Sequence, residues 1–99
     1  MIGTIVEIAV APGSGDAFER AFAAQASAVG ANEAGNRLYE LFRSQTLPDT
    51  YALVEIYEDA AALAVHQTSQ HMMTNRPLTA PFLIGPPVAH MFDVVSDFD

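Results

Sequence analysis

The chain has 99 residues, of which 51% are hydrophobic and 16% are charged, and its net charge is -8. This length predicts a single domain spanning residues 1–99. Four basic residues in so acidic a chain argue against nucleic-acid binding and attachment to an anionic membrane, and the absence of cysteine excludes disulfides and cysteine-ligated metals. Because neither a secretory signal nor an uninterrupted apolar span is evident, we expect a cytoplasmic location and no membrane partner.

The first third of the chain predicts a strand followed by a helix. β-branched residues alternate over residues 2–10, which is typical of a strand. A turn over residues 11–15 leads to Asp16, which we expect to cap a helix running from about Ala17 to Val29. Glycine and asparagine residues beyond Val29 are stop signals. The predicted buried stripe of this helix consists of Phe18, Phe22, Ala26 and Val29.

A hairpin is predicted next. Residues 37–43 and residues 51–58 have the alternation of strands, and the short turn at residues 47–50 makes them antiparallel neighbours. Large apolar groups occur on both faces of these strands. This pattern indicates that both faces of the sheet are covered in the assembled protein.

The last third of the chain predicts helical turns, an irregular segment and a final strand. Asp59 is placed to cap a helix over residues 60–67, and Ser69 to break it and recap a further turn or two through Met73. The remaining predicted segments are an irregular proline-rich stretch over residues 75–87, a strand over residues 88–95 and a tail over residues 96–99.

The order β-α-β-β-α-β is that of the ferredoxin-like fold, an α+β architecture. We therefore expect a four-stranded antiparallel sheet with helices on one face. The uncovered face needs a partner, and a homodimer with the two sheets packed face to face is the simplest symmetric solution.

The third strand and the helical turns after it resemble the antibiotic biosynthesis monooxygenase family of dimeric α+β barrels. The residues that carry the resemblance are Leu53-Val54-Glu55-Ile56-Tyr57-Glu58-Asp59, Leu63 and His66-Gln67-Thr68-Ser69-Gln70-His71. The resemblance implies a dimer that oxidises phenols and hydroquinones with O2 and no cofactor. Tyr57 stands where relatives often have tryptophan, and Glu7, Tyr57 and the lack of a histidine near Asn75 argue against the haem-degrading members.

Histidine is the side chain best suited to act as a base near neutral pH, and His66, His71 and His90 are the candidates. His66 and His71 are five residues apart, whereas metal-binding pairs on one helix favour four, so no metal site is predicted. A helix break at Ser69 would still allow both rings to reach one cavity. The alternative is that both histidines only cap or bridge loop carbonyls.

With the family's chemistry in view, either His71 or His66 is the expected base that forms a phenolate, and Tyr57 is the expected hydrogen-bonding partner. The expected substrate-binding residues are Tyr39, Glu55, Phe22 and Met72. Aromatic and methionine side chains at such spacing are more often ordinary core residues. Glu55 has two interpretations, a buried carboxylate that orients a histidine or an ion pair with Arg37 or Arg43.

The sequence thus favours a cofactor-independent monooxygenase that acts on a small phenolic or quinol-type aromatic together with O2. Two alternatives stay open: an isomerase or lactone-type enzyme that uses the same acid–base groups without oxygen, and a non-catalytic module that binds a small molecule.

Overall fold

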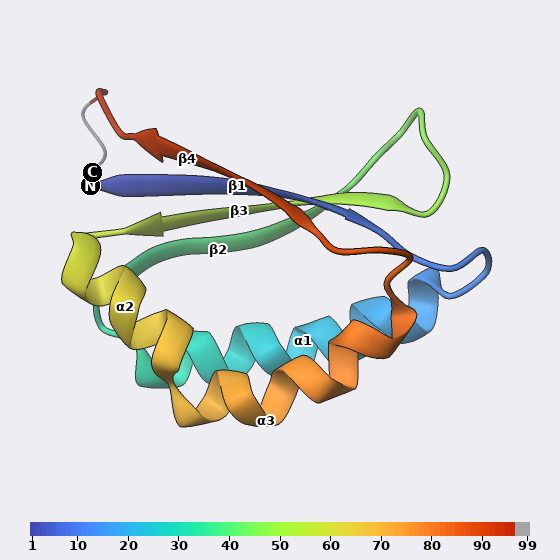
Figure 1. Ribbon diagram of the computed structural model, residues 1–99, viewed down its shortest axis with the longest axis horizontal. Coiled ribbons are helices and arrows are strands. Elements are labelled where there is room, and N and C mark those ends of the chain that lie inside the picture. The colour runs from blue at the N-terminus through green and yellow to red at the C-terminus, as the bar shows by residue number, and fades with distance from the viewer. Residues whose placement is uncertain (97–99) are drawn as a thin grey trace.

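The computed structural model describes residues 1–96 and confirms the ferredoxin-like α+β fold (Figure 1). Within these residues the antiparallel strands form a four-stranded sheet in the order β2-β3-β1-β4. Apart from Ser96, the predicted tail lies outside the described residues. No helix in the described part of the chain is long and apolar enough to cross a membrane. The elements are β1 (Ile2–Ala9), α1 (Gly15–Asn32), β2 (Asn36–Arg43), β3 (Thr50–Tyr57), α2 (Ala60–Thr68), α3 (Gln70–Thr79), the 3-10 turn η1 (Ala80–Phe82) and β4 (Val88–Asp93).

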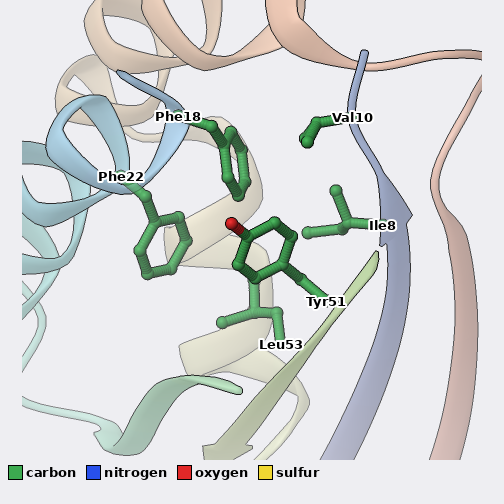
Figure 2. Close-up of a cluster of buried hydrophobic side chains, with 6 residues drawn as sticks. All are labelled: Ile8, Val10, Phe18, Phe22, Tyr51 and Leu53. Atoms are coloured by element: carbon green, nitrogen blue, oxygen red, sulfur yellow. The ribbon is translucent and has the colours of Figure 1, made fainter. Parts of the chain in front are cut away.

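The helices lie together on one side of the sheet, as predicted (Figure 1). The core between these layers forms because even-numbered residues of β1 and odd-numbered residues of β3 point toward α1. Phe18 of α1 packs against the ring of Tyr51 with centroids 5.0 Å apart. Figure 2 shows the buried cluster that results, which comprises Ile8, Val10, Phe18, Phe22, Tyr51 and Leu53.

The opposite side of the sheet, here called the outer sheet face, is covered by no helix of the described residues (Figure 1). The strand register places odd-numbered residues of β1 and even-numbered residues of β2 and β4 on this face, pointing away from the core. They include the large apolar residues Ile5, Phe42, Val88 and Phe92. Between 39% and 55% of each of these residues is exposed. The sheet therefore has one buried face and one apolar face open to solvent.

Two predicted boundaries of α1 are wrong. The N-cap residue is Ser14, and Asp16 lies inside the first turn. There its negative charge interacts favourably with the positive end of the helix dipole. The helix also continues past Gly30 to Asn32. A glycine within a helix costs only about 1 kcal/mol, which the packing of α1 against α3 outweighs.

The prediction of an irregular segment from residue 75 to residue 87 is wrong in its first part. Helix α3 continues through Pro77 to Thr79 and is followed directly by η1. Proline removes one backbone hydrogen bond from a helix interior. The helix persists because its buried residues, Met72, Asn75 and Thr79, are packed on the side that faces the core.

Candidate active site

A cavity of about 300 Å³ lies between the sheet and the helices. Five of the residues predicted for the site line it: Phe22, Tyr39, Glu55, His66 and Met72. Gln25, Arg76 and Thr79 also line it and were not singled out by the sequence. A smaller pocket of about 180 Å³ shares Val6, Glu55, His66 and Arg76 with the cavity and extends to β4.

One wall of the cavity is a flat aromatic surface made by β2 and α1. The ring of Tyr39 stacks on Phe22, with centroids 5.5 Å apart and ring planes 4° from parallel. The Tyr39 hydroxyl accepts a hydrogen bond from Gln25 Nε2 at 2.7 Å, and Gln25 Oε1 accepts one from Thr79 Oγ1 at 3.2 Å. Burial raises the pKa of Tyr39 well above its usual range. The hydroxyl therefore stays protonated and has its own hydrogen to donate.

Glu33 is the central acidic group of the site, although nothing in the sequence distinguished it from a solvent-exposed residue after a helix. It occupies the C-cap of α1, and its side chain is only 2% exposed. His66 Nδ1 lies 2.9 Å from Glu33 Oε2, and His71 Nε2 hydrogen-bonds to the same oxygen. The carboxylate thus joins the two histidines that the sequence selected.

The predicted break at Ser69 is confirmed, and it is what brings the two histidines together. Ser69 ends α2 and begins α3, where its Oγ accepts a hydrogen bond from the Met72 backbone N–H at 3.3 Å. The same hydroxyl donates to the His66 carbonyl at 2.9 Å. The chain turns at this residue, so rings five positions apart approach Glu33 from neighbouring helices.

Glu55 is the second buried carboxylate, and it points inward from β3. It accepts hydrogen bonds from Thr4 Oγ1 at 2.9 Å and from the Tyr57 hydroxyl at 2.5 Å. Its Oε1 atom lies 3.6 Å from His66 Nε2, just beyond hydrogen-bond distance. Of its two interpretations, the ion pair with an arginine is wrong. Arg37 pairs with Glu58 at 3.0 Å and Arg43 with Glu19 at 2.7 Å.

The remaining predicted residues lie outside the cavity lining. Tyr57 is fully buried, with its ring 5.4 Å from that of His66, and its hydroxyl is committed to Glu55. Burial, reinforced by the hydrogen bond to Glu55, raises the pKa of Tyr57 above its usual range. His71 is on the far side of Glu33 and 15% exposed, while His90 is 2.7 Å from Glu7 on the outer sheet face.

Glu33, His66 and His71 are residue types that also occur around metal ions, and one ligand-type atom from each lies within 4.8 Å of the others. Both imidazoles contact the same Glu33 oxygen directly. The geometry is accordingly that of a hydrogen-bonded acid–base cluster, in which a carboxylate fixes the orientation of two rings.

Comparison with known proteins assigns this architecture to a family. The family model described as antibiotic biosynthesis monooxygenase matches residues 1–74. This chain belongs to that family. The resemblance of the third strand and the His66–His71 segment is thereby confirmed.

Solved structures of bacterial proteins support the assignment. A protein from Caulobacter crescentus, provisionally named an antibiotic biosynthesis monooxygenase, is 32% identical, with a TM-score of 0.91 over 96% of this chain and 90% of that one. A provisionally named counterpart from Bordetella bronchiseptica is 29% identical, with a TM-score of 0.82 over 96% and 97% of the two chains. A third, from Nitrosomonas europaea, shares the fold at 24% identity and a TM-score of 0.86, covering 97% of this chain and all 100% of its own.

The family match includes part of the site and leaves part of it out. Within the matched range are Glu55 and the acid–base cluster of Glu33, His66 and His71. Arg76 and Thr79 lie beyond residue 74, although both line the cavity. In this member of the antibiotic biosynthesis monooxygenase family, the C-terminal part of α3 therefore completes the cavity wall.

Proposed function

We propose that this protein is a monooxygenase that oxidises a small phenolic or quinol-type aromatic with O2, without a cofactor, and that His66 is the base. The observation that carries the proposal is the setting of His66. One of its ring nitrogens is held by the buried Glu33 carboxylate, and the ring itself lines the cavity beside Glu55.

The hydrogen bond to Glu33 selects the form of His66 that can accept a proton. A carboxylate is only an acceptor, so the Nδ1 atom of a neutral His66 carries the hydrogen and its Nε2 atom carries the lone pair. Glu55 Oε1, at 3.6 Å from Nε2, is too distant for a hydrogen bond but close enough to stabilise the imidazolium that proton uptake creates. This is the arrangement of a general base held by a carboxylate.

The proposed reaction begins when His66 takes the proton of the phenolic hydroxyl, whose pKa is near the ~10 of tyrosine. The phenolate transfers one electron to O2, and the resulting phenoxyl radical and superoxide combine at a ring carbon to form a peroxide. The imidazolium returns its proton to the peroxide, the O–O bond breaks, and a quinone and water leave. Both hydrogens lost by the aromatic, one from oxygen and one from carbon, end in the water.

The cavity suits such a substrate in shape and polarity. Its volume of about 300 Å³ is at the lower end for small-molecule sites. The stacked rings of Tyr39 and Phe22 offer a flat apolar surface for an aromatic ring. Tyr39 supplies a hydroxyl donor, and Arg76 is a positive group that favours a phenolate. We assign the base to His66 rather than His71 because only His66 lines the cavity.

The proposal is tested by measuring O2 consumption with a panel of hydroquinones and naphthols. We expect substrate-dependent O2 uptake by the wild-type protein, and a loss in kcat/KM of about 10²- to 10⁴-fold in His66→Gln, the usual contribution of a general base. Arg20→Gln, a change at an exposed position of α1, should keep the wild-type rate.

Two results would contradict the proposal. One is the absence of O2-dependent turnover with every compound of the panel, and the other is an unchanged rate in His66→Gln. Product that forms equally well without oxygen would instead identify an isomerase or lactone-type enzyme.

A further inference from the structure

We infer that Glu33 and His71 form a proton relay between the cavity and solvent, in which His71 releases a proton as His66 gains one. The inference rests on the proposed function insofar as it takes His66 to be the base. It gives a role to His71, which the oxidation itself does not use, and a second role to Glu33, the carboxylate that holds His66.

The hydrogen-bonded path runs from the cavity outward. His66 lines the cavity and reaches Glu33 Oε2 through Nδ1 at 2.9 Å, and His71 Nε2 reaches the same oxygen from the other side. The exposed fraction of the side chain is 8% for His66, 2% for Glu33 and 15% for His71. His71 is therefore the member of the cluster through which protons exchange with solvent.

The surroundings of His71 fix which nitrogen faces which way. Asn75 Nδ2 donates to the His71 carbonyl at 2.7 Å, which holds the first turn of α3. Ser69 Oγ lies 3.2 Å from His71 Nε2, while its own hydrogen is donated to the His66 carbonyl. With Nε2 turned toward Glu33, Nδ1 is the nitrogen that can give a proton to water.

Charge couples the two rings. One carboxylate oxygen accepts from both imidazoles, so Glu33 balances one imidazolium well, and a second imidazolium beside it is repelled. The other ionisable groups that face His66 from its neighbouring elements are Glu55 and Tyr57 of β3, Tyr39 of β2 and Arg76 of α3.

None of these groups removes that coupling. Glu55, 3.6 Å from His66 Nε2, favours the His66 imidazolium, whereas the positive Arg76 in the same cavity opposes it, so the repulsion between the two rings remains. Tyr39 and Tyr57 are neutral, since burial raises the pKa of both. A proton gained by His66 is therefore offset most directly by a proton lost from His71.

The first test needs no substrate. Protein labelled with ¹⁵N-histidine and treated with EDTA is titrated by NMR, which reports the charge and tautomer of each ring. We expect the two rings to become cationic in separate steps, and His66 to bind a proton about tenfold more tightly in His71→Gln, the size typical of coupled sites. A His66 titration that is the same in His71→Gln and in wild type would overturn the relay.

The second test follows the proton itself under anaerobic conditions. We mix the protein with 1-naphthol in a weakly buffered solution, and record naphtholate by its absorption and released protons by an indicator dye. Wild type and the control Arg20→Gln, a change at an exposed position of α1, should release about one proton per naphtholate formed, whereas His71→Gln should form naphtholate and retain the proton.

The outcomes separate the relay from the proposed function. Naphtholate formation without proton release by the wild-type protein overturns the relay and leaves the base intact. If no naphtholate forms, the proposed reaction loses its first step, and the NMR titration still decides whether the rings are coupled. A purely structural cluster would change stability in His71→Gln but would not change the number of protons released.

Discussion

The Tyr57 hydroxyl and the Glu55 carboxylate form a buried pair in which a neutral donor holds a charged acceptor. Tyr57 donates to Oε1 at 2.5 Å and Thr4 to Oε2 at 2.9 Å, and Glu55 is only 6% exposed. A buried carboxylate is tolerated only where hydrogen bonds replace its lost water. Glu55 can therefore stand beside His66 in the cavity because Tyr57 supports it from behind.

We predict that Tyr57→Phe lowers the free energy of unfolding by about 1–3 kcal/mol at pH 7, because one Glu55 oxygen loses its donor while it stays buried. The pKa of Tyr57 is raised in the folded protein, so folding favours the neutral hydroxyl. Its contribution is fully present below the unfolded pKa of about 10 and falls as pH rises above that value. Urea unfolding at pH 7 and above pH 10 measures both effects.

The difference in stability between wild type and Tyr57→Phe should therefore shrink at alkaline pH. A difference that is constant from pH 7 to pH 11 would mean that Tyr57 ionises no differently in the two states, contrary to its burial. The fold of the variant is checked by its circular dichroism.

At the residue scale, the sequence singled out His66 and His71 as candidate site residues but not Glu33, the carboxylate that joins them. His66 and His71 stand out because their residue type suits acid–base chemistry near neutral pH. Glu33 carries no such signal, because an acidic residue after a helix is usually solvated. Only the fold, which places the corner between α2 and α3 over the end of α1, converts Glu33 into a buried acceptor.

Among the elements, α2 is the one whose placement most directly sets the position of the base, since it carries His66. It approaches the turn between α1 and β2 closely at Gly35. A Cβ atom added to Gly35 would lie 2.6 Å from the Cβ of Ala62, a distance that real side chains do not adopt. Gly35 thus permits α2 to pack against this turn.

We predict opposite effects for the same substitution at two glycines. Gly35→Ala should destabilise the protein by about 1–3 kcal/mol through overpacking against α2, and it should lower activity because His66 moves with that helix. Gly30→Ala should stabilise it by about 0.5–1 kcal/mol, since Gly30 lies in α1 with nothing within 4 Å of an added Cβ. Thermal unfolding of both variants, and steady-state rates, would show whether the effects differ in sign as the packing requires.

Element periodicity explains which parts of the fold the sequence predicted well. Alternation in β1, the hairpin of β2 and β3, and the Phe18–Phe22 stripe of α1 each reflect burial on one side, so their pattern is visible locally. The course of α3 through Pro77 is not visible in the local sequence. A proline there signals a break, and only the packing of the helix against the rest of the fold overrides that signal. The C-terminal boundary of α1 was predicted wrongly for the same reason, because Gly30 signals a stop and the packing of the helix overrides it.

At the scale of the whole molecule, the two faces of the sheet differ in what covers them. The inner face is closed by the helices and encloses the cavity, whereas the outer sheet face exposes Ile5, Phe42, Val88 and Phe92. His90 Nε2 lies 2.7 Å from the Glu7 carboxylate among these apolar groups. An apolar patch on this face, at the flat side of a sheet, is the kind of surface that a second copy covers in a symmetric dimer.

We therefore propose that the protein is a homodimer through the outer sheet face, and we predict that Val88→Asp dissociates it. A stable interface buries roughly 800 Å² per partner, and a buried, unpaired carboxylate within it is strongly unfavourable. Val65→Asp is the matched control, because Val65 is 56% exposed against 52% for Val88 but lies on α2, away from this face. Sedimentation at micromolar concentration should give twice the mass of the 10.6 kDa chain for wild type and Val65→Asp, and a single chain for Val88→Asp. A wild-type protein that sediments as a single chain would refute the dimer, and equal dissociation in both variants would place the interface elsewhere.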